Sequence, residues 1–509
     1  MRKISFWISI ILPLALTTAC KKNSFLTSTV TNNLDSTTVF KDSTYAMEFL
    51  NGIYTNIGFA TDPKRFVSGG QVAGLESACD EAEGPNLSAS NGFTMFATGT
   101  VNPTIVPTDA WSTPYTQIRA CNQFLTHLYE IPFNAALKSE TEGEVRFLRA
   151  WYYFIMLEHY GGVPLIGDSI FSGADPVNIP RSSFSSCVNY ISNECDTAAT
   201  LLPTTQGGSN YGRVSGGAAL ALKSRVLLYA ASPLFQGGGF AASGAGGLDS
   251  IVAYPDQDPN RWVLAANAAQ AVISLGVYSL NVDSAAGALG DGFMSVFLTR
   301  SNSEYILAHM FDPGNKYLEQ CWDAPSRGGG GGAHPYQELV DAYPMSNGLA
   351  ITDPNSGYNP NAPYQNRDPR LYYTIIHDST IRPLWENSPG PILTYLNAIR
   401  QRAGVPQYGT GNDALAAPAS QDAMRTAIRQ ERRVELAFEN VRYFDTRRWK
   451  IAQTTDAGPF YGMNMYVDGS AFYLKTLLET RVFQPRDYFF PIPNNEVLKD
   501  DLMVQNPGW

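Results

Sequence analysis

Apolar residues recur every three to four positions in several stretches of the chain, a spacing that predicts amphipathic helices. In the segment 42–57, an Asp-Ser-Thr start is followed by Tyr45, Phe49, Ile53 and Ile57 at this spacing. Similar stretches predict further helices at 111–131, 139–162, 188–202, 212–232 and 261–280. The chain is therefore expected to be mostly α-helical.

The most aromatic stretch is RAWYYFIMLEHYGGVPLI, residues 149–166. The segment 139–162 that contains it begins with acidic residues, which suit the positive end of a helix dipole. Its apolar side chains cover most of the helix circumference, so the helix should pack between neighbours. Most of these rings are accordingly predicted to be core, with Gly161, Gly162 and Pro164 ending the helix.

The predicted helices follow one another in helix-turn-helix pairs with small residues at interior positions. This arrangement is similar to a divergent tetratricopeptide array, which would serve as a scaffold. Long irregular stretches rich in Gly, Pro, Ser and Thr interrupt the helices at 60–110, 235–260, 311–335 and 343–365. Loops of this length are unusual unless they carry function, so binding residues are expected there.

The N-terminus has the pattern of an export signal. Arg2 and Lys3 precede an apolar run from Ile4 to Leu16, which is too short to span a membrane comfortably. Cys20 follows Ala19 at the point where cleavage would fall, and the stretch is similar to a bacterial lipobox. We expect residues 1–19 to be a signal peptide, Cys20 to carry lipid, and 20–38 to be a flexible tether. The alternative is a plain signal peptide with an incidental cysteine.

Charge and cysteine content narrow the function further. The net charge of −10 disfavours nucleic-acid binding, which needs clustered Lys and Arg. Five further cysteines, an odd number, contain no CxxC pair, so a zinc site is not expected and buried free thiols are predicted. No HExxH, GxSxG or P-loop motif occurs, and neither a cofactor nor a catalytic residue is assigned.

Motifs that resemble those of one protein family occur along almost the whole chain. In order, they are FLNGIYTNI, WSTPYTQIRACNQFL, EVRFLRAWYYFIMLEHYGGVPLI, GRVSGGAALALKSRVLLYAAS, HPYQELVDAYPMSNGLAI, RDPRLYYTII, LNAIRQRAGVP, IRQERRVELAFENVRYFDTRRWK, DYFFPIPNNEVLKD and QNPGW. They resemble the SusD/RagB family of nutrient-binding outer-membrane lipoproteins of the Bacteroidetes. The resemblance implies a single SusD-like domain at 39–509, with a helical part at about 39–310 and a C-terminal part at about 311–509.

The family resemblance also implies a function. The chain would be a lipid-anchored glycan-binding protein at the outer membrane, exposed on the cell surface. It would capture oligosaccharide and deliver it to a SusC-type TonB-dependent transporter. A peptide-binding member is the main alternative, because some family members bind peptides. An enzyme acting on polysaccharide is the third, because opposed carboxylates are hard to recognise in a sequence.

Two departures from the family pattern concern particular stretches. The family has a further Ala- and Glu-rich helix shortly before the segment that starts at Leu396, whereas this chain enters that segment directly from a Pro-rich turn. Lys21 and Lys22 stand where acidic residues often follow the lipidated cysteine. The first departure bears on the stability of the C-terminal half. The second departure argues against display of the protein on the outer face of the membrane, but not against lipidation.

Candidate ligand-binding residues come from two of the irregular stretches. The acidic stretch 76–86 offers Asp80 and Glu81, because carboxylates accept strong hydrogen bonds from sugar hydroxyls. The alternative is a solvated acidic loop, and no EF-hand spacing supports a calcium site. The Gly-rich stretch 311–337 offers Trp322, Tyr317 and Tyr336, whose flat rings suit the apolar faces of pyranose units.

The Arg-rich stretch 429–450 is interpreted as structural. Arg432 and Glu435, and likewise Glu439 and Arg442, are three residues apart and could pair along a helix. Aromatic residues follow immediately, so some of these arginines are expected to fix the packing of neighbouring loops.

Overall fold

The computed structural model describes residues 36–509 except for short stretches of the chain. The residues that it does not describe within that range are 63–64, 67–73, 85–91, 107–109, 173–174, 176, 241–246, 282–288, 311–330, 378–391, 410–413 and 465–472. The predicted signal peptide, Cys20 and most of the predicted tether therefore lie outside the described residues, as do Tyr317 and Trp322.

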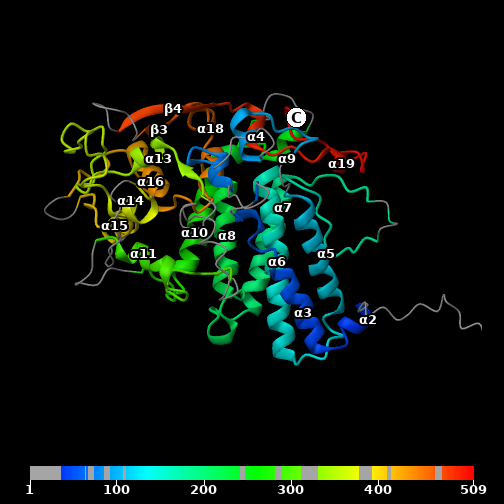
Figure 1. Cartoon of the computed structure of the whole chain (residues 1–509). Coiled ribbons are helices and arrows are strands. Elements are labelled where there is room, and N and C mark those ends of the chain that lie inside the picture. Colours follow the sequence, from blue (N-terminus) through cyan, green and yellow to red (C-terminus); the bar gives the residue numbers. More distant parts are fainter. Residues whose placement is uncertain are drawn as a thin grey trace, which may run out of the picture.

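The first part of the chain is an array of helices that lie side by side (Figure 1). The array consists of α3 (Ser43–Tyr54), α5 (Ser112–His127), α6 (Ala135–Tyr160), α7 (Phe184–Leu201), α8 (Gly216–Ala231) and α10 (Asn260–Ile273). Three shorter helices, α2 (Ser36–Val39), α4 (Gly92–Thr98) and α9 (Leu248–Val252), also belong to this part of the chain, and α4 contacts β4. Side-chain caps start several of them, since Asn134, Ser183 and Ser215 each accept a hydrogen bond from a backbone N–H in the first turn. Each of α5, α6, α7 and α8 packs on the next long helix, which gives the expected scaffold of helix pairs.

Helix α6 is the centre of this array, and its rings are core as predicted. Tyr152, Tyr153 and Tyr160 are fully buried. Their polar tips stay satisfied, because the Tyr152 hydroxyl donates to the Ile53 carbonyl at 2.6 Å and the Tyr160 hydroxyl accepts from the Ala110 N–H at 2.9 Å. The crowded rings thus hold the helices together and also fix the loops around them.

The helix ends where the sequence predicts. Gly161 follows α6 with φ +79°, a conformation that favours glycine. A Cβ on Gly162 would lie 2.1 Å from the carbonyl oxygen of Ser182, so the chain can pass there only without a side chain. These two glycines let the connection to α7 run directly against the end of α6.

The C-terminal part packs beside the array and is built from shorter elements (Figure 1). Its helices are α13 (Gln337–Ala342), α14 (Pro369–Thr374), α15 (Ile392–Arg402), α16 (Gln421–Glu435), α17 (Arg442–Arg448), α18 (Ala452–Thr455) and α19 (Asn494–Val497). Helix α11 (Asp291–Leu298) precedes the expected boundary at about 311 but contacts α14 and α15 of this part. A small second core joins α13, α14 and α16 through Leu339, Tyr343, Leu371 and Val434. The large core reaches into this part as well, through Tyr443, Phe489 and Phe490.

Two short antiparallel pairs are the only strand ladders among the described residues. Strand β1 (Ala82–Glu83) pairs with β2 (His334–Pro335), and β3 (Gly458–Asn464) pairs with β4 (Leu474–Arg481). The first pair connects the 74–84 segment to the C-terminal part. The second forms a hairpin across one end of the molecule, over α13 and α18 (Figure 1).

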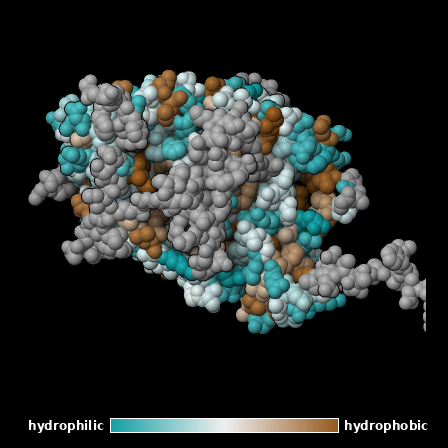
Figure 2. Space-filling model, viewed as in Figure 1, coloured by the Kyte–Doolittle hydropathy of each residue, from teal (hydrophilic) through white to brown (hydrophobic). Residues whose placement is uncertain are grey.

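The state of the cysteines and the character of the helices can be compared with the sequence predictions. Cys79, Cys121, Cys187 and Cys195 are buried free thiols, as predicted, whereas Cys321 lies outside the described residues. Within the described part of the chain, no helix has both the length and the apolar character needed to cross a membrane. Figure 2 shows hydrophilic and hydrophobic residues interspersed over the face in view.

Candidate functional site

The candidate site is a groove on both sides of the turn at residues 211–213. On one side, α3 and residues 308–310 enclose about 390 Å³. On the other side, residues 205–207, 277–278 and 301–308 enclose about 140 Å³. Tyr211, Gly212, Arg213 and Ala308 line both hollows, so the two hollows are adjacent, and together they are called the groove. Its floor and walls come from four segments of the chain, 51–57, 205–213, 277–278 and 301–310.

A buried carboxylate fixes the wall of the groove beside α3. Arg213 donates to Glu144 on α6 from Nε at 3.0 Å and from Nη2 at 2.7 Å. The Tyr54 hydroxyl donates to the same carboxylate at 2.6 Å. Burial, and then the Glu144 charge, raise the pKa of Tyr54 well above its usual value, so the phenol stays protonated. The Tyr54 ring and the Arg213 guanidinium are therefore held in place before any ligand arrives.

The turn itself needs glycine and presents a tyrosine. Gly212 has φ +94°, and a Cβ there would lie 2.5 Å from Cγ of Met310. The hydroxyl of Tyr211 has no hydrogen-bond partner among the described residues although the oxygen is buried. A phenol in this state can donate to, or accept from, a hydroxyl group that enters the groove.

The other side chains that line the groove are aromatic rings, amides and hydroxyls, which suit ligands with both polar and apolar faces. Tyr211, Tyr278 and Tyr305 supply rings, while Asn51, Thr55, Ser301, Asn302 and Ser303 supply amides and hydroxyls. Concave sites that hold sugars combine flat apolar surface with a few oriented polar groups. The groove has both, and its volume matches that of small-molecule sites.

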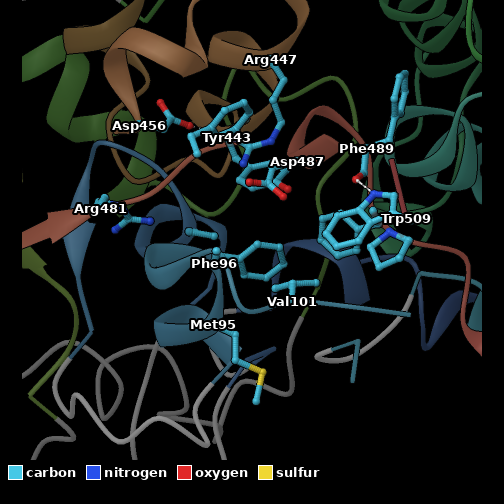
Figure 3. A pocket seen from close by; sticks show the side chains of 15 residues that line it. Met95, Phe96, Val101, Tyr443, Arg447, Asp456, Arg481, Asp487, Phe489 and Trp509 are labelled. Atoms are coloured by element: carbon cyan, nitrogen blue, oxygen red, sulfur yellow. Dashed lines mark hydrogen bonds and ion pairs between the residues drawn. The ribbon is translucent and has the colours of Figure 1, made fainter. Parts of the chain in front are cut away.

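A small pocket outside the groove, shown in Figure 3, has no room for such a ligand. Its volume is about 10 Å³, room for roughly one water molecule. Phe96, Tyr443 and Trp509 line it, and the Arg447 guanidinium lies 3.4 Å from the Tyr443 ring centroid. This hollow is a packing junction between the α4 region and the C-terminal end of the chain.

The structure places the predicted aromatic residues in different surroundings. Tyr317 and Trp322 lie outside the described residues, but Met310, in the wall of the groove, directly precedes the 311–330 stretch that contains them. Tyr336 is described and fully buried. Its hydroxyl donates to Glu479 and accepts from Arg481, and its ring packs on Phe460. Tyr336 was predicted as a ligand-binding residue of a Gly-rich irregular stretch; these contacts hold it against the β3–β4 hairpin, and a ligand role for it stays a prediction.

The predicted acidic residues are also buried rather than exposed. Asp80 is 2% exposed, and Arg442 donates to its two oxygens from Nε and Nη2, both at 2.7 Å. Burial alone would raise the pKa of Asp80, but the charges of Arg433 and Arg442 hold it below its usual value. Glu81 is 1% exposed and accepts from the Phe438 N–H at 3.2 Å. The expected exposure of this acidic stretch is therefore wrong, because these carboxylates face the C-terminal part; a ligand role for them stays a prediction.

Glu76 lies in the same buried segment and gives the protein a pH dependence. It is fully buried, its Oε1 accepts from the Gly74 N–H at 2.6 Å, and burial raises its pKa from 4.5 to about 7. The folded state thus holds this proton more tightly than the unfolded state, so its contribution to stability declines as the pH rises from 4.5 to 7.

We expect Glu76→Gln to remove this decline. The free energy of unfolding of the variant should rise relative to that of the parent between pH 4.5 and 7. At pH 8 the variant should be more stable than the parent by at most about 3 kcal/mol. Urea unfolding of both proteins across this pH range measures the difference. A difference that does not change with pH would contradict the assignment.

Sequence reasoning missed the residues that form the groove. Tyr54 was covered by a predicted helix, and nothing local distinguished it from the core residues of that helix. Gly212 and Arg213 stood at the start of another predicted helix, and Tyr211 just before it. The one available signal was their position beside a Gly- and Ser-rich turn at 207–212.

Neither a metal nor a cofactor site emerges from the described geometry. Within the described ranges, no three His, Cys, Asp or Glu side chains are placed so that they could hold a metal ion. His159 is buried in the core, where its Nδ1 lies 2.7 Å from the Ile155 carbonyl oxygen, and burial holds its pKa well below the usual value.

The fold and the groove together define a class of protein: a helical scaffold that presents an open polar and aromatic site. Comparison with known families then identifies the chain as a member of the SusD family. One model, described as "SusD family", matches residues 296–383 and 384–509, and a second, described as "Starch-binding associating with outer membrane", matches residues 24–228. The chain thus belongs to an outer-membrane-associated family of binding proteins, in agreement with the prediction that it is not an enzyme.

Solved structures confirm the predicted mostly α-helical SusD-like fold. A SusD-like protein from Bacteroides fragilis is 24% identical with a TM-score of 0.69, and the match covers 92% of this chain and 98% of that one. A SusD-like carbohydrate binding protein of the same organism is 21% identical with a TM-score of 0.69, covering 92% and 100%. Surface glycan-binding protein A from Bacteroides fluxus is 18% identical with a TM-score of 0.57, covering 92% and 100%.

The matches cover different shares of the chain. A SusD-like protein P2 from Formosa agariphila is 29% identical over 118 residues, a stretch that spans 23% of this chain and 20% of that relative. The first family model matches in two segments that meet between residues 383 and 384. This break falls in the stretch before Leu396 where the sequence analysis predicts that a helix of the family is missing.

Proposed function

We propose that this protein binds oligosaccharide at the outer membrane and delivers it to a SusC-type TonB-dependent transporter. In this proposal, residues 1–19 are the signal peptide, and lipid on Cys20 anchors the protein through the 20–38 tether. The groove around residues 211–213, together with Tyr317 and Trp322, is the ligand-binding surface. The protein binds the glycan and does not cleave it.

The observation that carries the proposal is membership in a family with a starch-binding model over residues 24–228. The names of two structural neighbours, a carbohydrate binding protein and a surface glycan-binding protein, point the same way. The groove adds chemistry that fits, because tyrosine rings, amides and hydroxyls meet within about 390 Å³ beside α3. Display on the cell surface is likewise part of the proposal.

Calorimetry with a panel of neutral oligosaccharides tests the proposal. We expect Trp322→Ala and Tyr211→Ala each to weaken binding of the recognised glycan about tenfold or more, because each removes a ring on which a sugar face can stack. Tyr129→Ala is the matched control, since Tyr129 is 77% exposed and does not line the groove.

The outcomes separate the parts of the proposal. No binding by any glycan of the panel would contradict the function. Binding that both variants leave unchanged would contradict the site alone. Release of shorter sugars from an incubated glycan would instead favour an enzyme.

A further inference from the structure

A separate cavity of about 440 Å³ lies in the C-terminal part of the molecule. Its walls come from α13, from the 344–350 connection, from the end of α15 with residue 408, and from α16. None of its lining residues lines the groove around residues 211–213. Ala350 and Gln430 are exposed, so the cavity opens to solvent between the 344–350 connection and α16.

Two arginines in this cavity have unused N–H groups. Arg400 is 3% exposed; its Nε donates to the Pro406 carbonyl at 2.8 Å and its Nη1 donates to Glu431 at 2.8 Å. Its Nη2 has no hydrogen-bond partner among the described residues, and the same holds for Nε of Arg433. Buried donors without acceptors are costly, so the cavity is suited to a ligand that brings acceptor oxygens.

Helix α13 supplies acceptors to the same cavity. Glu338 and Asp341 on α13 line the cavity, with side chains 28% and 29% exposed. Lys475 contacts both carboxylates, at 3.1 Å and 3.2 Å, which leaves them one net negative charge and several free lone pairs. A ligand hydroxyl that accepts from one of the arginines can therefore donate to one of these carboxylates.

An aromatic ring and a glycine complete the cavity. The Arg400 guanidinium stacks over the Tyr408 ring at 4.5 Å from its centroid, which holds the ring and the cation in fixed orientation. Gly348 has φ +76°, and a Cβ there would lie 2.6 Å from Nη2 of Arg400. The glycine thus allows the Arg400 guanidinium to pack directly against the 344–350 connection.

The charge balance of the cavity selects among polar ligands. Glu431 compensates Arg370 and Arg400, and Asp80 lies 3.2 Å from Nη2 of Arg433. A carboxylate or sulfate would meet arginines that already have anionic partners and would be repelled by Glu338 and Asp341. A neutral ligand with many hydroxyls meets no such cost, because hydroxyls both donate and accept.

We propose that this cavity is a second saccharide-binding site, which takes one or two neutral sugar units and is independent of the groove. The choice of a sugar among neutral polyhydroxylated ligands rests on the proposed function. The location and the neutral, hydroxyl-rich chemistry rest on the cavity itself.

Hydrogen–deuterium exchange of the intact protein, with and without excess sugar, locates binding directly. The probes are D-glucose, D-galactose, D-xylose and N-acetyl-D-glucosamine. We expect at least one of them to slow exchange about twofold or more in residues 338–350 and 430–434. Ala350→Trp places an indole at the mouth and should abolish this protection. Gln430→Trp obstructs the same opening from α16 and serves as an independent second variant.

The control is Ala423→Trp, an exposed position on α16 that does not line the cavity and should keep the protection. No protection by any of the four sugars, or protection that persists in both obstructed variants, would overturn the inference. Stronger protection by D-galacturonate than by D-galactose would overturn the choice of a neutral ligand. The calorimetric result for the groove is separate, because Tyr211 does not line this cavity.

Discussion

Replacing Arg370 by methionine should destabilise the protein by about 3–5 kcal/mol, because it leaves buried carboxylates without their central cation. Arg370 is fully buried. Its guanidinium lies 2.7 Å from Asp368, 2.6 Å from Glu431 and 2.6 Å from Glu435. Burial alone would lower the pKa of Arg370, but the Asp368 and Glu431 charges raise it above its usual value, so the cation is present at any physiological pH.

Urea unfolding measures this effect through the midpoint and the extrapolated free energy of unfolding. Arg425→Met is the matched control on α16, because Arg425 and its partner Asp422 have side chains 47% and 87% exposed. Exposed pairs contribute about 0–1 kcal/mol, so the control should stay close to the parent. A loss below about 1 kcal/mol for Arg370→Met would show that the three carboxylates find other compensation.

This cluster also explains why the Arg-rich stretch was only partly predictable. Its charges stand near one another in the sequence, which favoured pairing within one helix. In the structure, Glu435 instead contacts Arg370 and Arg402, and Arg442 contacts Asp80. The predicted pairs of Arg432 with Glu435 and of Glu439 with Arg442 are not formed. The broader expectation, that arginines of this stretch hold neighbouring segments, describes these contacts correctly.

The helices were predictable because their cause is local. The rings of Tyr152, Tyr153 and Tyr160 recur at helical spacing, and a helix that is apolar on most sides must be packed between others. The caps and the Gly161 stop are likewise set by residues within one turn of the helix end. The family resemblance supplied the arrangement of these helices, which periodicity alone does not determine.

The candidate site was less predictable because its causes lie far apart in the chain. Asp80 and Glu81 belong to a locally polar, turn-rich stretch, and such stretches are usually solvated. Asp80 is buried because Arg442, 362 residues later, supplies the compensating charge. The groove is likewise formed by segments that are distant in the sequence, since α3, the turn at 211–213 and residues 308–310 meet only in the folded chain. No local pattern in one sequence reveals such meetings.

Arg442→Met should destabilise the protein by about 3 kcal/mol or more, and its effect should be concentrated in one segment. Asp80 would keep only Arg433, at 3.2 Å, in place of two hydrogen bonds at 2.7 Å from Arg442. Asp80 lies between the 3₁₀ helix Leu75–Ala78 and β1, so its contact with Arg442 ties this segment to α17. Hydrogen–deuterium exchange should therefore accelerate first in residues 75–83, at denaturant concentrations where the α6 amides remain protected.

A double-mutant cycle with Asp80→Asn distinguishes the ion pair from general packing. If the bidentate contact causes the effect, Asp80→Asn and Arg442→Met together should cost clearly less than the sum of the two single changes, by about 1–3 kcal/mol. Arg442→Met alone leaves a buried carboxylate short of a partner, whereas the double variant leaves none. Additive losses, or faster exchange spread evenly over the molecule, would contradict this account and would assign Arg442 no special part in holding the 74–84 segment.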